Sequence, residues 1–169
     1  MEFSQAFYDL RIHFECSGDV SKFLFAYQDR AGVWTIGIGT THYPDGTPVK
    51  EGDTCTIEQA IEYAANDTKH ISAILPQNIT QGLFDAGGDF SYNAGIGAWK
   101  SSTLYHNIQN NIPIEKHNFT DWDKAHVNGQ LVELDGLLRR RMAEYYLAVN
   151  GVNSPDFCVG ELEEYKNAA

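Results

Sequence analysis

The feature that most constrains the fold of this sequence is a change in hydrophobic periodicity near residue 25. Aromatic and β-branched residues fill both arms of the segment 25–39, and the glycine-containing turn at 30–32 separates the arms. Such a pattern is typical of a β-hairpin. A second turn, rich in proline and glycine, occupies residues 43–48 and predicts a short third strand near Val49.

Outside this segment the apolar residues recur at helical spacing. A stripe in the first residues predicts a helix that ends about Glu15, and everything after the third strand is expected to be helical. Thr56 followed by Gln59 indicates a capping box. Further helices are expected over 56–75, from Thr80, and over 102–110, 119–125 and 134–149.

A Gly87–Gly88 pair lies inside one of the expected helices. Each glycine costs a helix about 1 kcal/mol relative to alanine, so we expect another element to pack closely there. A small sheet near the front followed by helices is an α+β arrangement.

The chain has 169 residues, which is about the length of one domain. We expect a single domain made of a small N-terminal lobe (1–55), a connecting helix (56–75), a helical lobe (80–150) and an acidic tail (152–169).

The acidic composition limits the partners of this protein. The formal net charge is −11, which argues against nucleic acid and anionic lipid as partners, because both attract basic patches. No targeting segment and no run of eighteen apolar residues is found, so a cytoplasmic product is expected. The three cysteines and six histidines show no metal-ligand spacing, and no cofactor or metal is implied.

Two carboxyl groups and a hydroxyl remain as candidates for chemistry. Glu15 follows Phe14 at the end of the first helix, Asp29 lies at the hairpin turn, and Thr35 follows on the return strand. Glycoside hydrolysis needs such a pair of acids, one to protonate the leaving oxygen and one to stabilise the transition state or orient water. Paired acids are common in a chain with 23 of them, so the pair alone is weak support.

Longer stretches of the sequence resemble the phage endolysin lysozymes, glycoside hydrolase family 24. The resemblance runs in order from about residue 8 to 149. It is carried by AYQDRAGVWTIGIGTT (26–41), YPDG (43–46), GDTCT (52–56), FSYNAGIGAWKSSTL (90–104), FTDW (119–122) and GLLRRRMAE (136–144).

The resemblance implies an N-acetylmuramidase with a lysozyme-like fold and a cleft between two lobes. The Glu–Asp–Thr set of the family falls on Glu15, Asp29 and Thr35, with glutamate as the proton donor and the other two holding the attacking water. The segment between Glu15 and Asp29 is longer than the family pattern, which indicates an insertion within 16–23. Asp19 therefore stays open as an alternative acid.

The resemblance also suggests residues that bind the substrate. Gly39 and Thr40 would form the floor of the cleft, the Asn93 amide would bind sugar acetamido groups, and Trp122 would stack on a sugar. Helix packing of Asn93 and a core position for Trp122 are the alternatives. Arg139 or Arg140 would pair with the carboxylates across the cleft, and Arg140 is our choice.

The expected function is hydrolysis of the β-1,4 bond between N-acetylmuramic acid and N-acetylglucosamine in peptidoglycan, leading to lysis of the host cell. A monomeric enzyme would accumulate in the host cytoplasm and depend on a membrane-permeabilising protein, a holin, for release. Two other functions stay open. One is a non-catalytic peptidoglycan-binding homologue in which the insertion displaces the acid, and the other is a zinc-dependent amidase or peptidase.

Overall fold

The chain folds into two compact units. In this computed structural model the described residues are 1–29, 32–127 and 129–151. The N-terminal unit is Tyr8–Ala73, and the helical unit joins Met1–Phe7 to the chain from Ile74 onward. The acidic tail predicted at 152–169 lies outside the described residues.

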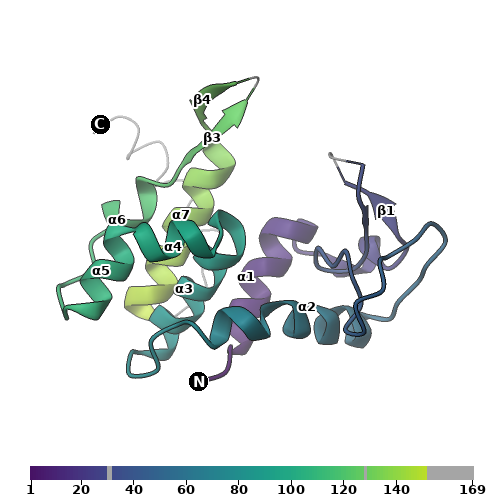
Figure 1. The fold of residues 1–169 in the computed structure, drawn as a ribbon, viewed down its shortest axis with the longest axis horizontal. Coiled ribbons are helices and arrows are strands. Elements are labelled where there is room, and N and C mark those ends of the chain that lie inside the picture. Colours follow the sequence, from purple (N-terminus) through teal and green to yellow (C-terminus); the bar gives the residue numbers. More distant parts are fainter. Residues whose placement is uncertain (30–31, 128, 152–169) are drawn as a thin grey trace. The chain divides into compact units, whose positions relative to one another are not determined.

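The elements confirm the predicted α+β class (Figure 1). The first part of the chain forms α1 (Gln5–Cys16), the 3₁₀ helix η1 (Val20–Phe23), β1 (Tyr27–Gln28), β2 (Trp34–Thr35) and α2 (Ile57–Ser72). The second part forms α3 (Gln81–Ala94), α4 (Ile96–Ser101), α5 (Thr103–Gln109), α6 (His117–Thr120), β3 (Lys124–Val127), β4 (Gln130–Glu133) and α7 (Asp135–Asn150).

The predicted hairpin is confirmed, with shorter strands than expected. Strands β1 and β2 are antiparallel, and Tyr27 pairs with Thr35. Gly37 and Gly39 have φ angles of +60° and +84°, so the chain leaves the extended conformation soon after β2. A tight turn follows, in which Ile36 and Thr40 exchange backbone hydrogen bonds of 2.9 and 3.1 Å.

The third strand predicted near Val49 does not form. The backbone there makes only an isolated bridge between His42 and Pro48, next to a hydrogen bond from Val49 N to Thr41 O. Proline has no N–H to donate, which prevents a continuous ladder at this point.

The capping box predicted at the start of α2 is confirmed. The Thr56 hydroxyl accepts from Gln59 N at 3.2 Å, and Gln59 Oε1 accepts from Thr56 N at 2.9 Å. Both bonds satisfy backbone donors that the first turn of a helix leaves unpaired.

The insertion contributes to the core of the N-terminal unit. Ser17 and Gly18 are exposed, as their polarity suggests. Cys16 and Val20, however, are buried in one cluster with Ile38, Ala60 and Ala64. The segment 16–23, in which the insertion is expected, therefore contains an exposed turn between two core residues.

Close packing at the glycines of α3 is confirmed. A Cβ on Gly87 would lie 2.9 Å from the Trp99 ring, and a Cβ on Gly88 would lie 2.2 Å from the Phe3 ring. Helices α3 and α7 lie side by side (Figure 1), and a glycine of α3 also allows their close approach. A Cβ on Gly82 would lie 2.2 Å from the carbonyl oxygen of Leu147.

The helix predicted over 119–125 is wrong in its second half. Helix α6 ends at Thr120, and Lys124 begins a second hairpin, β3–β4, in which Lys124 pairs with Glu133. Gly129, in the link between the two strands, has a φ of +82°. The expectation that this whole part is helical is therefore also wrong.

Candidate functional site

Glu15 lies in the last turn of α1 and is half-buried. Burial, followed by the negative charge of Glu15, raises the pKa of the neighbouring Cys16 to about 11. Cys16 anchors the end of the helix in the core, so the backbone that carries Glu15 is held in place.

Asp29 lies directly after β1, at the exposed end of the hairpin. Its backbone N–H donates to Val33 O at 3.0 Å, and its carboxylate oxygen Oδ1 accepts from Val33 N at 2.9 Å. These bonds fix the carboxylate against the start of the return strand while it remains open to solvent.

Thr35 lies in β2 and is only 4% exposed. Its hydroxyl donates to Val33 O at 3.0 Å. A threonine hydroxyl has one hydrogen and two lone pairs, so this bond leaves the oxygen as an acceptor for a further group.

Asp29 and Thr35 share one face of the hairpin. Thr35 pairs with Tyr27, and Asp29 lies two residues after Tyr27, so the alternation of side chains places both on the same side. Diagonal neighbours of this kind are about 7–8 Å apart. The hairpin register therefore brings two oxygen acceptors to the same side, one exposed and one buried.

Asp19, the alternative acid, is engaged in capping η1. Its Oδ1 accepts from Ser21 N at 3.0 Å and from the Ser21 hydroxyl at 2.5 Å, and its Oδ2 lies 3.4 Å from Lys22 Nζ. The hydrogen bonds from Ser21 lower the pKa of Asp19. A carboxyl that is ionised this easily is a poor proton donor at neutral pH.

Thr40 lies in the N-terminal unit and is buried. Its hydroxyl donates to Asp67 Oδ2 on α2 at 2.7 Å. Gly39 precedes it and is half-buried. The side chain of Thr40 therefore holds this segment against α2.

Asn93 and Trp122 both belong to the helical unit. Asn93 is exposed on the last turn of α3, and its Oδ1 accepts from Arg141 Nη2. Trp122 is half-buried, and its ring meets the edge of Phe90 with centroids 5.4 Å apart. Arginine has only donors, so the Asn93 amide presents its NH₂ group away from Arg141.

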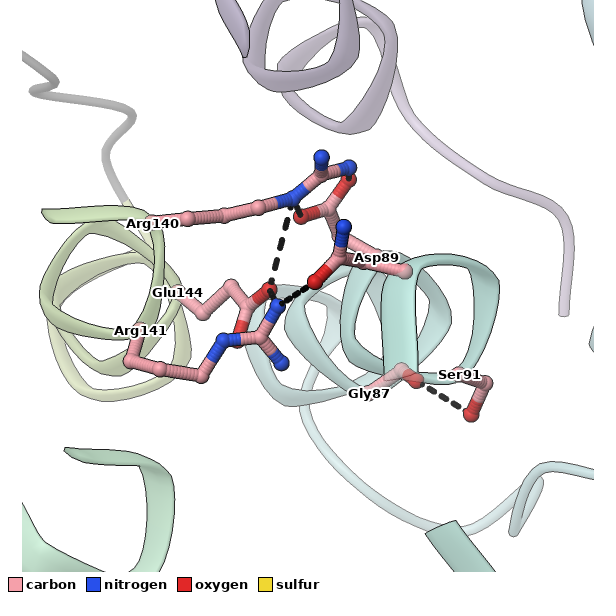
Figure 2. Close-up of polar contacts among 7 residues, drawn as sticks. Gly87, Asp89, Ser91, Arg140, Arg141 and Glu144 are labelled. Atoms are coloured by element: carbon pink, nitrogen blue, oxygen red, sulfur yellow. Dashed lines mark hydrogen bonds and ion pairs between the residues drawn. The ribbon is translucent and has the colours of Figure 1, made fainter. Parts of the chain in front are cut away.

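The three consecutive arginines of α7 differ in their surroundings. Arg139 is exposed, whereas Arg140 and Arg141 are buried. Arg140 makes a two-bond ion pair with Asp89 on α3, with Nε to Oδ2 and Nη2 to Oδ1 both at 2.8 Å (Figure 2). The predicted acidic partner of Arg140 was a catalytic carboxylate, and this ion pair with Asp89 was not anticipated.

Glu144 completes this buried cluster (Figure 2). Its Oε1 lies 3.1 Å from Arg141 Nη2, yet neither of its oxygens accepts an aligned hydrogen bond from a described residue. Burial raises the pKa of Glu144 well above its usual value, and the nearby charge of Arg141 only partly opposes this. Burial also acts to raise the pKa of Asp89, but the charge and hydrogen bonds of Arg140 outweigh it, so the pKa of Asp89 is lowered.

Sequence reasoning missed the buried polar residues Arg11, Asp89, Arg141 and Glu144. One signal was present for Arg11, which lies four residues after Phe7 and one after Leu10, on the apolar face of its helix. A charged residue within an apolar stripe indicates a buried polar contact.

Comparison with known proteins agrees with this α+β fold. The family model described as phage lysozyme matches residues 23–144. The matched stretch includes Asp29, Thr35 and Asn93, and it begins after Glu15.

Named relatives and solved structures extend the match. An endolysin of Acyrthosiphon pisum secondary endosymbiont phage 1 is 37% identical over 126 residues, which cover 72% of this chain and 83% of that protein. An endolysin from Escherichia coli O157:H7 phage FAHEc1 has a TM-score of 0.81 and 33% identity, with 91% of this chain and 97% of that chain covered.

The muramidase domain of SpmX from Asticaccaulis excentricus has a TM-score of 0.72 and 29% identity, with 88% of this chain and 97% of that chain covered. The chain belongs to the phage lysozyme family. It is an endolysin-type lysozyme, a hydrolase that lyses bacterial peptidoglycan. Among the described residues, no helix is both long and apolar enough to cross a membrane.

Proposed function

We propose that Glu15, Asp29 and Thr35 hydrolyse the β-1,4 bond between N-acetylmuramic acid and N-acetylglucosamine with inversion at the anomeric carbon. Glu15 protonates the leaving oxygen. Asp29 and Thr35 hold the water that attacks from the opposite face.

The Thr35 hydroxyl carries the argument for inversion. It donates a hydrogen bond to Val33 O and therefore acts as an acceptor toward any water that it binds. The Asp29 carboxylate is also an acceptor. A water between the two therefore donates both of its hydrogens, and its remaining lone pairs are available for attack. A carboxylate acting as a nucleophile would gain nothing from this hydroxyl.

The assignment of the acid to Glu15 rests on a contrast with Asp19. Asp19 caps η1 and has a lowered pKa, so it is ionised when the reaction needs a proton. Glu15 is half-buried at the end of α1, where its backbone is fixed. We therefore assign the acid to Glu15, because Asp19 is already engaged as the cap of η1.

Substrate contacts are proposed for five further residues. Gly39 and Thr40 present backbone to the sugar chain, since the Thr40 hydroxyl is bound to Asp67. Asn93 donates its NH₂ group to a sugar acetamido oxygen, and Trp122 offers part of its ring for stacking. Arg140 is held in a buried ion pair with Asp89, and a contact between its guanidinium and the substrate is the last part of this proposal.

The anomer of the first product tests this mechanism. Inversion predicts that the β-linked substrate initially yields the α-anomer, seen by proton NMR before mutarotation. An initial β-anomer would make Asp29 a covalent nucleophile and exclude the water-holding role. Mass spectra of the released fragments provide the control, because free reducing muramic acid ends identify a lysozyme and new amino termini identify an amidase or peptidase.

The route of the enzyme to the wall is a further part of the proposal. We propose that the protein acts as a monomer, collects in the host cytoplasm and reaches peptidoglycan after a holin permeabilises the membrane. Expression in a Gram-negative host tests this, with the culture divided and one half treated with a membrane-permeabilising solvent. Lysis confined to the treated half is expected, and equal lysis in both halves would contradict dependence on a holin.

A further inference from the structure

The proposed catalytic groups come from two separate pieces of the N-terminal unit. Glu15 ends α1, whereas Asp29 and Thr35 belong to the hairpin. The connection between them, residues 16–26, contains an exposed turn at Ser17 and Gly18. The exposed turn itself does not fix the distance between acid and water, so contacts made by buried residues have to do so.

Arg11 is the side chain that joins the two pieces. It is fully buried in α1, four residues and hence about one turn before Glu15. Its Nη2 donates to Ile38 O at 3.0 Å, and its Nη1 donates to Ala64 O at 3.1 Å. Ile38 follows Thr35 by three residues and Ala64 lies in α2, so one guanidinium connects α1, the segment after β2 and α2.

The segment after β2 is also attached to α2 directly. Thr40 donates to Asp67 on α2 at 2.7 Å. Burial raises the pKa of Asp67, while the hydrogen bond from Thr40 and the positive charge of Arg11 oppose that effect. The charge of Arg11 thus acts on the carboxylate that anchors Thr40, two residues from its own acceptor Ile38.

A second contact between α1 and this segment is weaker. Cys16 Sγ lies 3.5 Å from Gly37 O, and a thiol is a poor donor. Among the described residues, Arg11 therefore makes the stronger side-chain hydrogen bond from α1 to this segment, while a backbone hydrogen bond from Gly37 N to Phe23 O at 2.8 Å joins the segment to η1.

Stability alone does not account for an arginine at this position. Removing a guanidinium from water carries a desolvation cost, and an apolar side chain of similar size avoids it. An apolar side chain, however, makes no directional hydrogen bonds. The planar guanidinium aligns two carbonyl groups on different elements at fixed distances and angles.

We propose that Arg11 is a positioning residue that sets the distance between the helix ending in Glu15 and the hairpin carrying Asp29 and Thr35. The separation of acid and water then does not depend on the length of residues 16–26. This inference rests on the proposed function of the three residues.

The test replaces Arg11 and separates catalysis from binding and stability. In Arg11→Met the apolar stem remains and both donors are lost. We expect kcat on solubilised peptidoglycan chains to fall at least tenfold, because misplacement by about 1 Å costs up to 100-fold. KM should change less than twofold, since no proposed substrate contact is removed. Arg11→Lys retains a donor and should restore part of kcat.

Thr68→Val is the matched control. Thr68 is buried in α2, and its hydroxyl donates to the same Ala64 oxygen at 2.9 Å without contacting the hairpin segment. This variant should lower the melting temperature and leave kcat unchanged. Wild-type kcat in folded Arg11→Met would overturn the proposal, and so would an equal loss of kcat in Thr68→Val.

A failure to fold and a failure of the proposed function have to be distinguished from a failure of the positioning role. If Arg11→Met does not fold, Arg11→Lys decides, and an undiminished kcat in that variant overturns the positioning role. Glu15→Gln in the same assay reports on the proposed function instead. Full activity of Glu15→Gln would refute the catalytic assignment whatever Arg11 does.

Discussion

At the scale of single residues, the two carboxyl groups at either end of the exposed turn after α1 differ in what holds them. Asp19 accepts hydrogen bonds that keep it ionised, whereas Glu15 lies half-buried beside the core residue Cys16. In the helical unit the surroundings of Asp89 and Glu144 shift their pKa values in opposite directions, down for Asp89 and up for Glu144.

Glu15→Gln should leave a folded protein that lyses permeabilised Gram-negative cells at least a hundredfold more slowly. Glutamine keeps the shape of the side chain and cannot deliver a proton, and general acid catalysis contributes about 10²- to 10⁴-fold. The measurement is the rate of turbidity loss, with circular dichroism to confirm folding. Asp19→Asn is the control and should lyse normally. The reverse pattern would assign the acid to Asp19.

Glu144→Gln should make the protein more stable at pH 8 than the wild type. The pKa of Glu144 is raised on folding, so the unfolded chain releases its proton near the ordinary value of 4.5 while the folded protein retains it. The free energy of unfolding then decreases as pH rises above that value. A neutral glutamine removes this dependence.

Melting temperatures of both proteins from about pH 5 to pH 8 provide the measurement. Asp89 has a lowered pKa and loses its stabilising charge only at more acidic pH, so it does not contribute in this window. The difference between variant and wild type should grow with pH. A variant that is less stable by the same amount at every pH would show that Glu144 is an ionised partner of Arg141.

At the scale of elements, sequence reasoning succeeded where one local interaction decides the outcome. The capping box at Thr56 and the close contacts at Gly87 and Gly88 follow from single residues whose cost or hydrogen bonds are local. The β3–β4 hairpin was missed although Asn128–Gly129 is a strong hairpin signal, because short apolar runs nearby suggested helices.

Contacts between residues that are distant in sequence could not be predicted. The ion pair of Arg140 with Asp89 joins residues 51 positions apart, and nothing in the spacing selects Asp89 from the other acids. The three proposed catalytic residues were suggested by a family resemblance, since the chain offers many acidic pairs. Their shared face, in contrast, follows from strand register alone.

Gly82→Ala should destabilise the helical unit by about 1–3 kcal/mol, the usual cost of overpacking. The new Cβ would lie 2.2 Å from Leu147 O, which is backbone of α7 and cannot move without shifting the helix. Gly97 is also the second residue of its helix, α4, but a Cβ there meets nothing within 4 Å.

Gly97→Ala is therefore the matched control and should be neutral or stabilising by up to about 1 kcal/mol, because alanine is the better helix former. Chemical denaturation of both variants measures the two effects. The close approach of α3 and α7 would be refuted if Gly82→Ala also proved stabilising.

At the scale of the whole molecule, the net charge of the enzyme affects its encounter with the substrate. The enzyme has a net charge of −11, and peptidoglycan carries carboxylates, so the two repel one another at low ionic strength. The lysis rate should therefore rise about twofold or more between roughly 10 and 100 mM NaCl, as the Debye length falls to about 10 Å. A rate that falls steadily with salt would instead indicate a local basic patch as the docking surface.

Met1–Phe7 belongs to the helical unit, and this affects the order in which the two units can fold during synthesis. These residues are synthesised ahead of Tyr8–Ala73, yet Ser4 bonds to Asp85 and Phe3 packs against Phe84. The ribosome therefore has to deliver α3, with Asp85 lying 81 residues after Ser4, before these first residues can pack. A chain that stalls during translation would carry its hairpin and α2 with no completed helical unit, and lytic activity would appear only after the last helix has emerged.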